Sequence, residues 1–174
     1  MAIELARRAR AASVCALSPG GLWPSNDTQE ARRVHKLIRV GGRALRLTYP
    51  VAPLLLKLGV GRRAMLRNFV CHGERLSADR ALELYFTDPM DCTIMDDLAA
   101  SEEVAEPLDP LPCPITLAWA ANDRMVPAEP YGRMARELVP GASWLVLPGV
   151  GHNPMIDDPG LVARTILSVT SVEG

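Results

Sequence analysis

The sequence contains neither a long apolar run nor an excess of one charge. No apolar stretch approaches the roughly 20 residues that a membrane-spanning helix needs, and no signal peptide is visible at the N-terminus. The 19 basic and 20 acidic residues give a formal net charge of −1, whereas a nucleic-acid-binding surface needs an excess of Lys and Arg. We therefore expect a cytoplasmic protein with no membrane and no nucleic-acid partner.

Paired cysteine motifs are also missing. The four cysteines show no C-x-x-C spacing, and each lies in an apolar or helical context: Cys15, Cys71, Cys92 and Cys113. We interpret them as buried thiols of a reducing compartment. A thiol nucleophile or a metal site is the less favoured alternative. We expect no metal and no cofactor.

Basic residues are nevertheless distributed unevenly. Solvated helix faces account for such a cluster most simply, and a membrane surface or an anion-binding surface is the less favoured alternative. The cluster consists of Arg32, Arg33, Lys36, Arg39, Arg43, Arg46, Arg62, Arg63 and Arg67.

The hydrophobic pattern divides the chain into three parts. Residues 1–26 contain a helical pattern and one short apolar strand, and residues 27–108 contain five helical patterns separated by Pro and Gly. Residues 109–174 alternate strand and helix twice, which is typical of a parallel sheet. The fold class is therefore α/β, with a helical layer inserted between two parts of the sheet.

Element boundaries follow from periodicity and from residues that end helices or strands. In the middle part we expect Gly41-Gly42 to end one helix, and Pro50 and Pro53 to bend or break the next. Strands are predicted at residues 12–17, 115–119 and 143–147, and helices at residues 1–9, 62–70, 78–86, 90–99, 128–138 and from 157 onward.

Two loops follow consecutive predicted strands and carry candidate catalytic side chains. Asp123 lies in the first loop and His152 in the second. Ligands of open α/β sheets bind at the carboxyl ends of the strands, so both side chains can meet there. An aspartate that holds one imidazole nitrogen lets the other act as a general base on a serine. A turn-forming Asp and a structural His are the simpler alternatives for each residue alone.

Both loops resemble those of the α/β-hydrolase family. Residues 119–127 (WAANDRMVP) resemble the G-x-x-D-x-x-V/I-P loop that bears the family's acid. Residues 149–154 (GVGHNP) resemble the G-x-G-H-x-P loop that bears its histidine, and the order of acid before histidine also agrees. The resemblance implies a partial α/β-hydrolase fold with an inserted helical cap at residues 27–108. It also implies catalytic roles for Asp123 and His152.

The nucleophile motif of that family, G-x-S-x-G, has no match. Ser18, in Ala16-Leu-Ser-Pro-Gly, is a weak candidate because Ala replaces the first glycine and no long helix follows. Pro19 would also remove the amide that donates to the oxyanion. We expect Ser18 to end a strand and border the pocket. The nucleophile is then expected shortly before Met1, in a longer protein of which this chain is a truncated form.

Two kinds of function are compatible with these features. The first is serine-type hydrolysis of an ester or related carbonyl bond in a small, apolar substrate. Haloalkane or epoxide hydrolysis by an Asp nucleophile is the alternative chemistry. The second is a non-catalytic fragment or binding module, favoured for these 174 residues alone. The oligomeric state stays open. The residues expected to line the substrate pocket, if they do not simply pack, include Trp23, Phe69, Tyr85, Met95 and Val126.

Overall fold

The computed structural model describes residues 2–22, 29–91 and 105–170. Three parallel strands form a sheet in the order β1 (Val14–Leu17), β2 (Ile115–Ala120) and β3 (Ser143–Leu147). Val14 pairs with Ile115 and Thr116 pairs with Ser143. β2 is therefore the central strand, and all of its residues are buried, which explains its uninterrupted apolar sequence.

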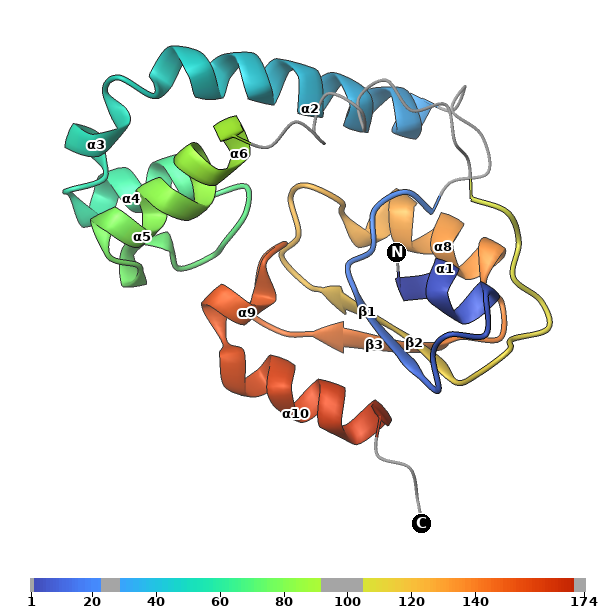
Figure 1. Ribbon diagram of the computed structural model, residues 1–174. Coiled ribbons are helices and arrows are strands. Elements are labelled where there is room, and N and C mark those ends of the chain that lie inside the picture. Colours follow the sequence, from blue (N-terminus) through green and yellow to red (C-terminus); the bar gives the residue numbers. More distant parts are fainter. Residues whose placement is uncertain (1, 23–28, 92–104, 171–174) are drawn as a thin grey trace.

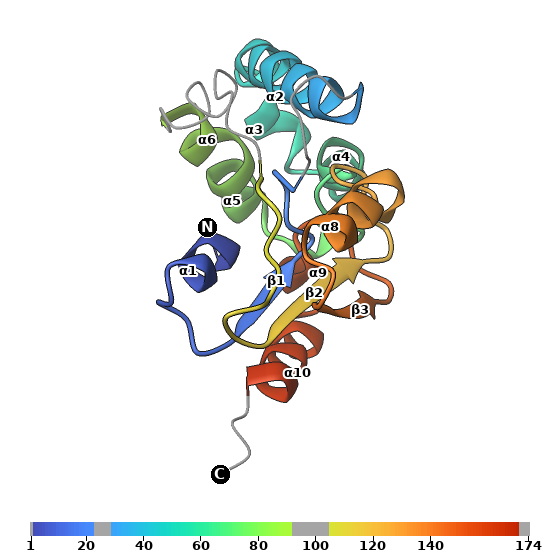
Figure 2. The same ribbon diagram turned by 90° about the vertical axis from the view of Figure 1, so that its right-hand side faces the viewer.

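Helices cover both faces of this sheet (Figure 1, Figure 2). α1 (Ala2–Arg7) and α8 (Arg133–Leu138) pack on one face, where their apolar side chains form one buried cluster with those of the strands. α10 (Pro159–Thr170) covers the other face, against which Leu161 packs. The parallel sheet predicted from the alternating pattern is present.

Two tryptophans attach the acid-bearing loop and α8 to the sheet. Trp119 of β2 and Trp144 of β3 stack with their ring centroids 5.3 Å apart, and the Arg136 guanidinium lies 3.7 Å from the Trp144 centroid. The buried Trp119 indole N–H donates to the Val126 carbonyl at 2.8 Å. That bond fixes the loop carrying Asp123 to the centre of the sheet.

Residues 29–91, which we call the helical segment, form a second layer (Figure 1). α3 to α6 lie beyond the carboxyl ends of β2 and β3, and no strand occurs between residues 29 and 91. Its buried side chains form a cluster of their own, which contains Leu56, Leu66, Tyr85 and Phe86. The helices are α2 (Gln29–Thr48), α3 (Ala52–Leu55), α4 (Gly59–Leu66), α5 (Ala78–Leu82) and α6 (Asp88–Asp91), with a 3-10 turn at Gly73–Arg75 and a π-helical turn at Glu83–Thr87.

The glycine pair Gly41-Gly42 does not end a helix, contrary to our expectation. α2 continues through both glycines to Thr48, two residues before Pro50. A glycine inside a helix costs only about 1 kcal/mol relative to alanine, whereas a proline costs about 3 kcal/mol because it lacks an N–H and its ring clashes with the preceding turn. Leu, Ala and Arg on both sides favour the helix. Proline therefore sets this boundary.

A proline also interrupts the helix that we expected at residues 128–138. Regular helix begins at Arg133, because residues Ala128–Gly132 form a π-helical turn in which Glu129, just before Pro130, is extended. The last predicted helix is present as α10, which begins at Pro159, and it is preceded by a short helix that we did not expect, α9 (Pro154–Asp157). Within the described residues, no helix is both long and apolar enough to cross a membrane.

Candidate active site

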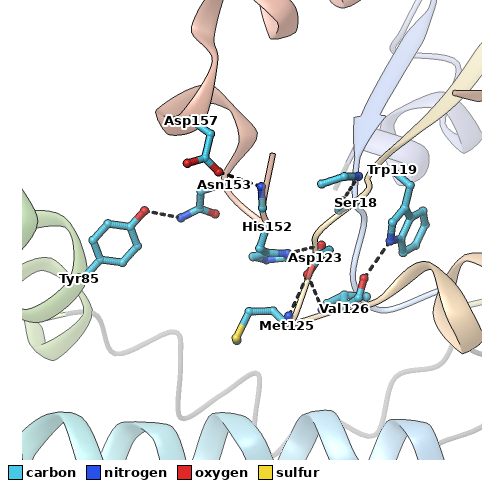
Figure 3. Close-up of polar contacts among 11 residues, drawn as sticks. Ser18, Tyr85, Trp119, Asp123, Met125, Val126, His152, Asn153 and Asp157 are labelled. Atoms are coloured by element: carbon cyan, nitrogen blue, oxygen red, sulfur yellow. Dashed lines mark hydrogen bonds and ion pairs between the residues drawn. The ribbon is translucent and has the colours of Figure 1, made fainter. Parts of the chain in front are cut away.

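The loops after β2 and β3 bring Asp123 and His152 together at the carboxyl ends of the strands (Figure 3). His152 Nδ1 lies 2.8 Å from Asp123 Oδ2. A carboxylate only accepts hydrogen bonds, so Nδ1–H donates and Nε2 carries the lone pair. No described residue is hydrogen-bonded to Nε2. The imidazole can therefore accept a proton from a group placed against it.

Backbone amides fix the Asp123 carboxylate. Its Oδ1 accepts hydrogen bonds from the N–H groups of Met125 and Val126, both at 2.8 Å. The Asp123 side chain is fully buried, whereas 27% of the His152 side chain is exposed. Oδ1 is thus held by backbone amides, whereas Oδ2 holds the imidazole. The loop backbone therefore fixes the orientation of the imidazole before any substrate binds.

The Ser18 hydroxyl is bonded to the backbone rather than to His152. Ser18 is 2% exposed, and its Oγ accepts a hydrogen bond from the Ala120 N–H at 3.0 Å (Figure 3). Its own N–H donates to the Ala118 carbonyl at 2.9 Å. Ser18 therefore continues the pairing of β1 with β2. Its φ of 39° is unusual for a residue other than glycine, but the buried hydroxyl is already occupied.

Three of the five expected pocket residues lie in the described part of the chain, and Trp23 and Met95 lie outside it. Val126 is 7% exposed and belongs to the cluster on the α8 face of the sheet. Phe69 and Tyr85 pack against each other in the helical segment, with ring centroids 5.1 Å apart. Packing is the role that the structure shows for these three side chains.

Asp157 joins the helical segment to the histidine loop, and sequence reasoning missed it. Its carboxylate accepts hydrogen bonds from the N–H groups of Cys71 at 2.9 and 3.0 Å, His72 at 2.8 Å and Gly151 at 2.8 Å. Asp157 is 6% exposed. Because Gly151 precedes His152, one buried carboxylate sets how the helical segment sits against the catalytic candidate.

The sequence contains one indication that Asp157 has a role of its own, because it stands next to a second aspartate, Asp158. A helix start needs one capping side chain, and Asp158 supplies it, because its Oδ1 accepts the Leu161 N–H at 2.8 Å. Asp157 is therefore not needed at that helix end. Its position in the chain does not reveal that the carboxylate points at a segment 86 residues away.

Asn153 makes a second set of contacts across the same junction. Its N–H donates to the Phe69 carbonyl at 2.9 Å, and its side-chain amide donates to the Tyr85 hydroxyl at 3.0 Å (Figure 3). Burial raises the pKa of Tyr85, so the phenol keeps its proton. A Cβ on Gly151 would lie 3.0 Å from the Phe69 carbonyl oxygen, so this close approach of two backbones favours glycine.

Thiol and metal chemistry find little support at this site. Burial raises the pKa of Cys15, and burial followed by the Asp157 charge raises that of Cys71, so both thiols are protonated rather than nucleophilic at neutral pH. Among the described residues, no three His, Cys, Asp or Glu side chains are grouped so that they could hold a metal ion.

Comparison with known proteins agrees with this geometry. A model of the alpha/beta hydrolase family matches residues 1–165. The chain is 28% identical over 172 residues to epoxide hydrolase EphH of Mycobacterium tuberculosis, an alignment that covers 97% of this chain and 79% of that protein.

Two solved structures share the fold. A thermophilic esterase from Thermogutta terrifontis has a TM-score of 0.61 at 20% identity, with 93% of this chain and 56% of that chain covered. A bacterial membrane phospholipase A has a TM-score of 0.53 at 17% identity, with 97% and 52% covered. The chain thus spans little more than half the length of these two structures. It carries part of the α/β-hydrolase fold, and it belongs to the alpha/beta hydrolase family.

Proposed function

We propose that the protein is a hydrolase of small molecules in which His152 is the general base and acid and Asp123 orients it. The observation that carries the proposal is the 2.8 Å contact between His152 Nδ1 and Asp123 Oδ2. With Oδ1 held by two amides and Nε2 unengaged, the pair has the arrangement that general-base catalysis on a nucleophile requires. No cofactor takes part in this chemistry.

In the ester-hydrolysing form of the reaction, His152 Nε2 takes the proton of a nucleophilic hydroxyl as that oxygen attacks the carbonyl carbon. The imidazolium is stabilised by Asp123 and then gives its proton to the leaving alcohol. Water, activated by the same nitrogen, cleaves the acyl-enzyme. We assign the nucleophile to a residue other than Ser18, because Ser18 is 2% exposed and its hydroxyl is hydrogen-bonded to the Ala120 N–H rather than to His152.

Epoxide hydrolysis is the second candidate reaction, and the 28% identity to an epoxide hydrolase favours it. A carboxylate would then open the ring and form an ester with the protein. His152 would activate the water that hydrolyses this ester. Both reactions use the histidine–aspartate pair as a base, so the nucleophile alone distinguishes them. In both, the helical segment would form the cap of the site, since residues 69–72 contact the histidine loop.

The test measures hydrolysis of short-chain p-nitrophenyl esters and of styrene oxide by the protein expressed from its own gene. Replacing His152 with Ala should lower kcat/KM by on the order of 10³–10⁴, and Asp123→Asn by a comparable factor. Asp158→Asn, which removes the same charge from a helix cap, should leave the rate within about twofold. Equal turnover by the His152→Ala variant would contradict the proposal.

The nucleophile is identified in the same preparation. Inactivation by a fluorophosphonate indicates a serine. A single turnover of the epoxide in ¹⁸O-labelled water that gives unlabelled diol indicates a carboxylate, because the protein then supplies the product oxygen. If the folded protein turns over neither substrate class, the non-catalytic binding module is the better description. The occupied hydroxyl of Ser18 is the observation that favours that alternative.

A further inference from the structure

A pocket lies where the helical segment meets the loop that carries Asp123. Its volume is about 440 Å³, which is within the range of small-molecule sites. The residues that line this pocket include no carboxylate. Its polar lining consists of Arg63, Arg67, Cys71 and His72 from the helical segment and of Asn122 and Arg124 from the loop after β2.

The arginines of this pocket have no ion-pair partner among the described residues. Arg63 and Arg67 lie one turn apart at the C-terminal end of α4, so they share a helix face. Arg124 reaches only the Arg67 carbonyl, at 3.5 Å. By contrast, Arg80 and Arg133 pair with glutamates at 2.6 and 3.3 Å. Three guanidinium groups therefore line one pocket.

Two carboxylates lie behind the lining, and neither neutralises Arg67 or Arg124. Glu74 contacts His72 Nδ1 at 3.5 Å and interacts electrostatically with Arg63. The Asp157 carboxylate is buried and occupied by three backbone amides. The positive charge of Arg67 and Arg124 is left to face the pocket.

The two walls of the pocket are held in place by the structure itself. Asp157 binds the amides of Cys71 and His72, and the Asn122 N–H donates to the Val150 carbonyl at 3.0 Å. Burial and the nearby Asp157 raise the pKa of Cys71, so its thiol adds no negative charge to the site. A ligand would meet walls that are already positioned, which lowers the entropic cost of binding.

We propose that this pocket binds an oxyanion, the phosphate or carboxylate group of a small molecule, through Arg67, Arg124 and Arg63. Guanidinium groups present paired N–H donors that match the geometry of such oxyanions. Arg124 and Asn122 come from the same loop as Asp123, but neither Asp123 nor His152 lines the pocket. The proposal goes beyond hydrolysis, because the anion binds whether or not His152 reacts.

Calorimetric titration of the full chain with inorganic phosphate, and separately with acetate, tests the proposal at constant ionic strength. The wild type should bind phosphate, acetate or both, and the stronger of the two identifies the group. The Arg67→Gln/Arg124→Gln variant should bind at least about tenfold more weakly, since each lost charge-assisted hydrogen bond is worth that much. Both side chains are exposed, so the variant should fold, which circular dichroism checks.

Arg46→Gln is the matched control, because it removes the same charge from an exposed position at the end of α2. It should change phosphate binding by less than about twofold, as expected for a distant, screened charge. Absence of binding to either anion by the wild type overturns the proposal. An equal loss of affinity in the Arg46→Gln variant also overturns it, because the anion would then be attracted by the overall charge of the protein. Unchanged binding in the Arg67→Gln/Arg124→Gln variant overturns it as well.

Discussion

The sheet and the helical segment hold their residues in place by different means. Paired strands place Asp123 and His152, and the buried, centrally located β2 carries the first of the two loops. The helical segment packs around a cluster of its own. It meets the histidine loop and α9 through the backbone of residues 69–72, the Tyr85 hydroxyl and the side chain of Ile156. The site therefore depends on the paired strands and on a junction made of a few hydrogen bonds and the packing of Ile156. Substitutions at the junction and inside the helical segment should have distinct effects.

The largest effect is expected at the junction. Asp157→Ala leaves the partly buried amides of Cys71 and His72 and the buried amide of Gly151 without an acceptor. We expect it to lower the free energy of unfolding by about 3–5 kcal/mol. Asp158→Ala removes only the exposed cap of α10 and should cost about 1 kcal/mol. Urea unfolding measures both. Equal losses would mean that Asp157 does not join the two layers.

A smaller effect is expected inside the helical segment. A Cβ on Gly61 would lie 2.1 Å from the Leu55 carbonyl oxygen, whereas a Cβ on Gly41 would meet nothing within 4 Å. We expect Gly61→Ala to destabilise the protein by about 2–3 kcal/mol and Gly41→Ala to stabilise it by about 0.5–1 kcal/mol. Thermal unfolding followed by circular dichroism measures the two changes. Effects of the same sign would show that α3 and α4 do not pack as described.

The smallest effect is expected at the Tyr85 hydroxyl. Tyr85→Phe removes the acceptor of the Asn153 amide and should cost about 0.5–1 kcal/mol at neutral pH. Burial raises the pKa of Tyr85 above its unfolded value of about 10. Its contribution to stability is therefore complete below pH 10 and is lost as the pH rises through the folded pKa.

The wild type should accordingly lose stability above pH 10 more steeply than Tyr85→Phe does. Tyr49→Phe, which removes another phenol from the helical segment, is the control and should follow the wild type. Urea midpoints between pH 8 and pH 11 give the comparison. Parallel curves for the wild type and Tyr85→Phe would show that the Tyr85 phenol is not protected by burial.

The features of the sheet and its loops can be predicted from the sequence, whereas those of the junction with the helical segment cannot. The strand at Ser143–Leu147 has the predicted bounds, and the one that begins at Ile115 extends one residue further than predicted. The contact between Asp123 and His152 is present at the expected edge. These features depend on local periodicity and on loops that follow consecutive strands, so they can be predicted from short stretches of sequence.

The junction and the arginine pocket depend on side chains that meet only after folding. Arg124 and Arg67 are 57 residues apart in the chain, and no local pattern shows that they face one hollow. Asp157 and Asp158 are chemically identical neighbours, yet one is buried and the other caps an exposed helix end. Which of two adjacent aspartates turns inward is decided by the helical segment that packs against it.

The stacked pair Trp119 and Trp144 gives the molecule an optical probe confined to one layer. The third tryptophan, Trp23, lies outside the described residues, and the helical segment contains tyrosines but no tryptophan. Tryptophans held in a fixed, asymmetric environment give near-ultraviolet dichroism bands distinct from those of tyrosine. If the helical segment swings away while the sheet stays folded, the tryptophan bands should persist and tyrosine dichroism should fade. Opening of the site and unfolding of its base can thus be told apart in a single spectrum.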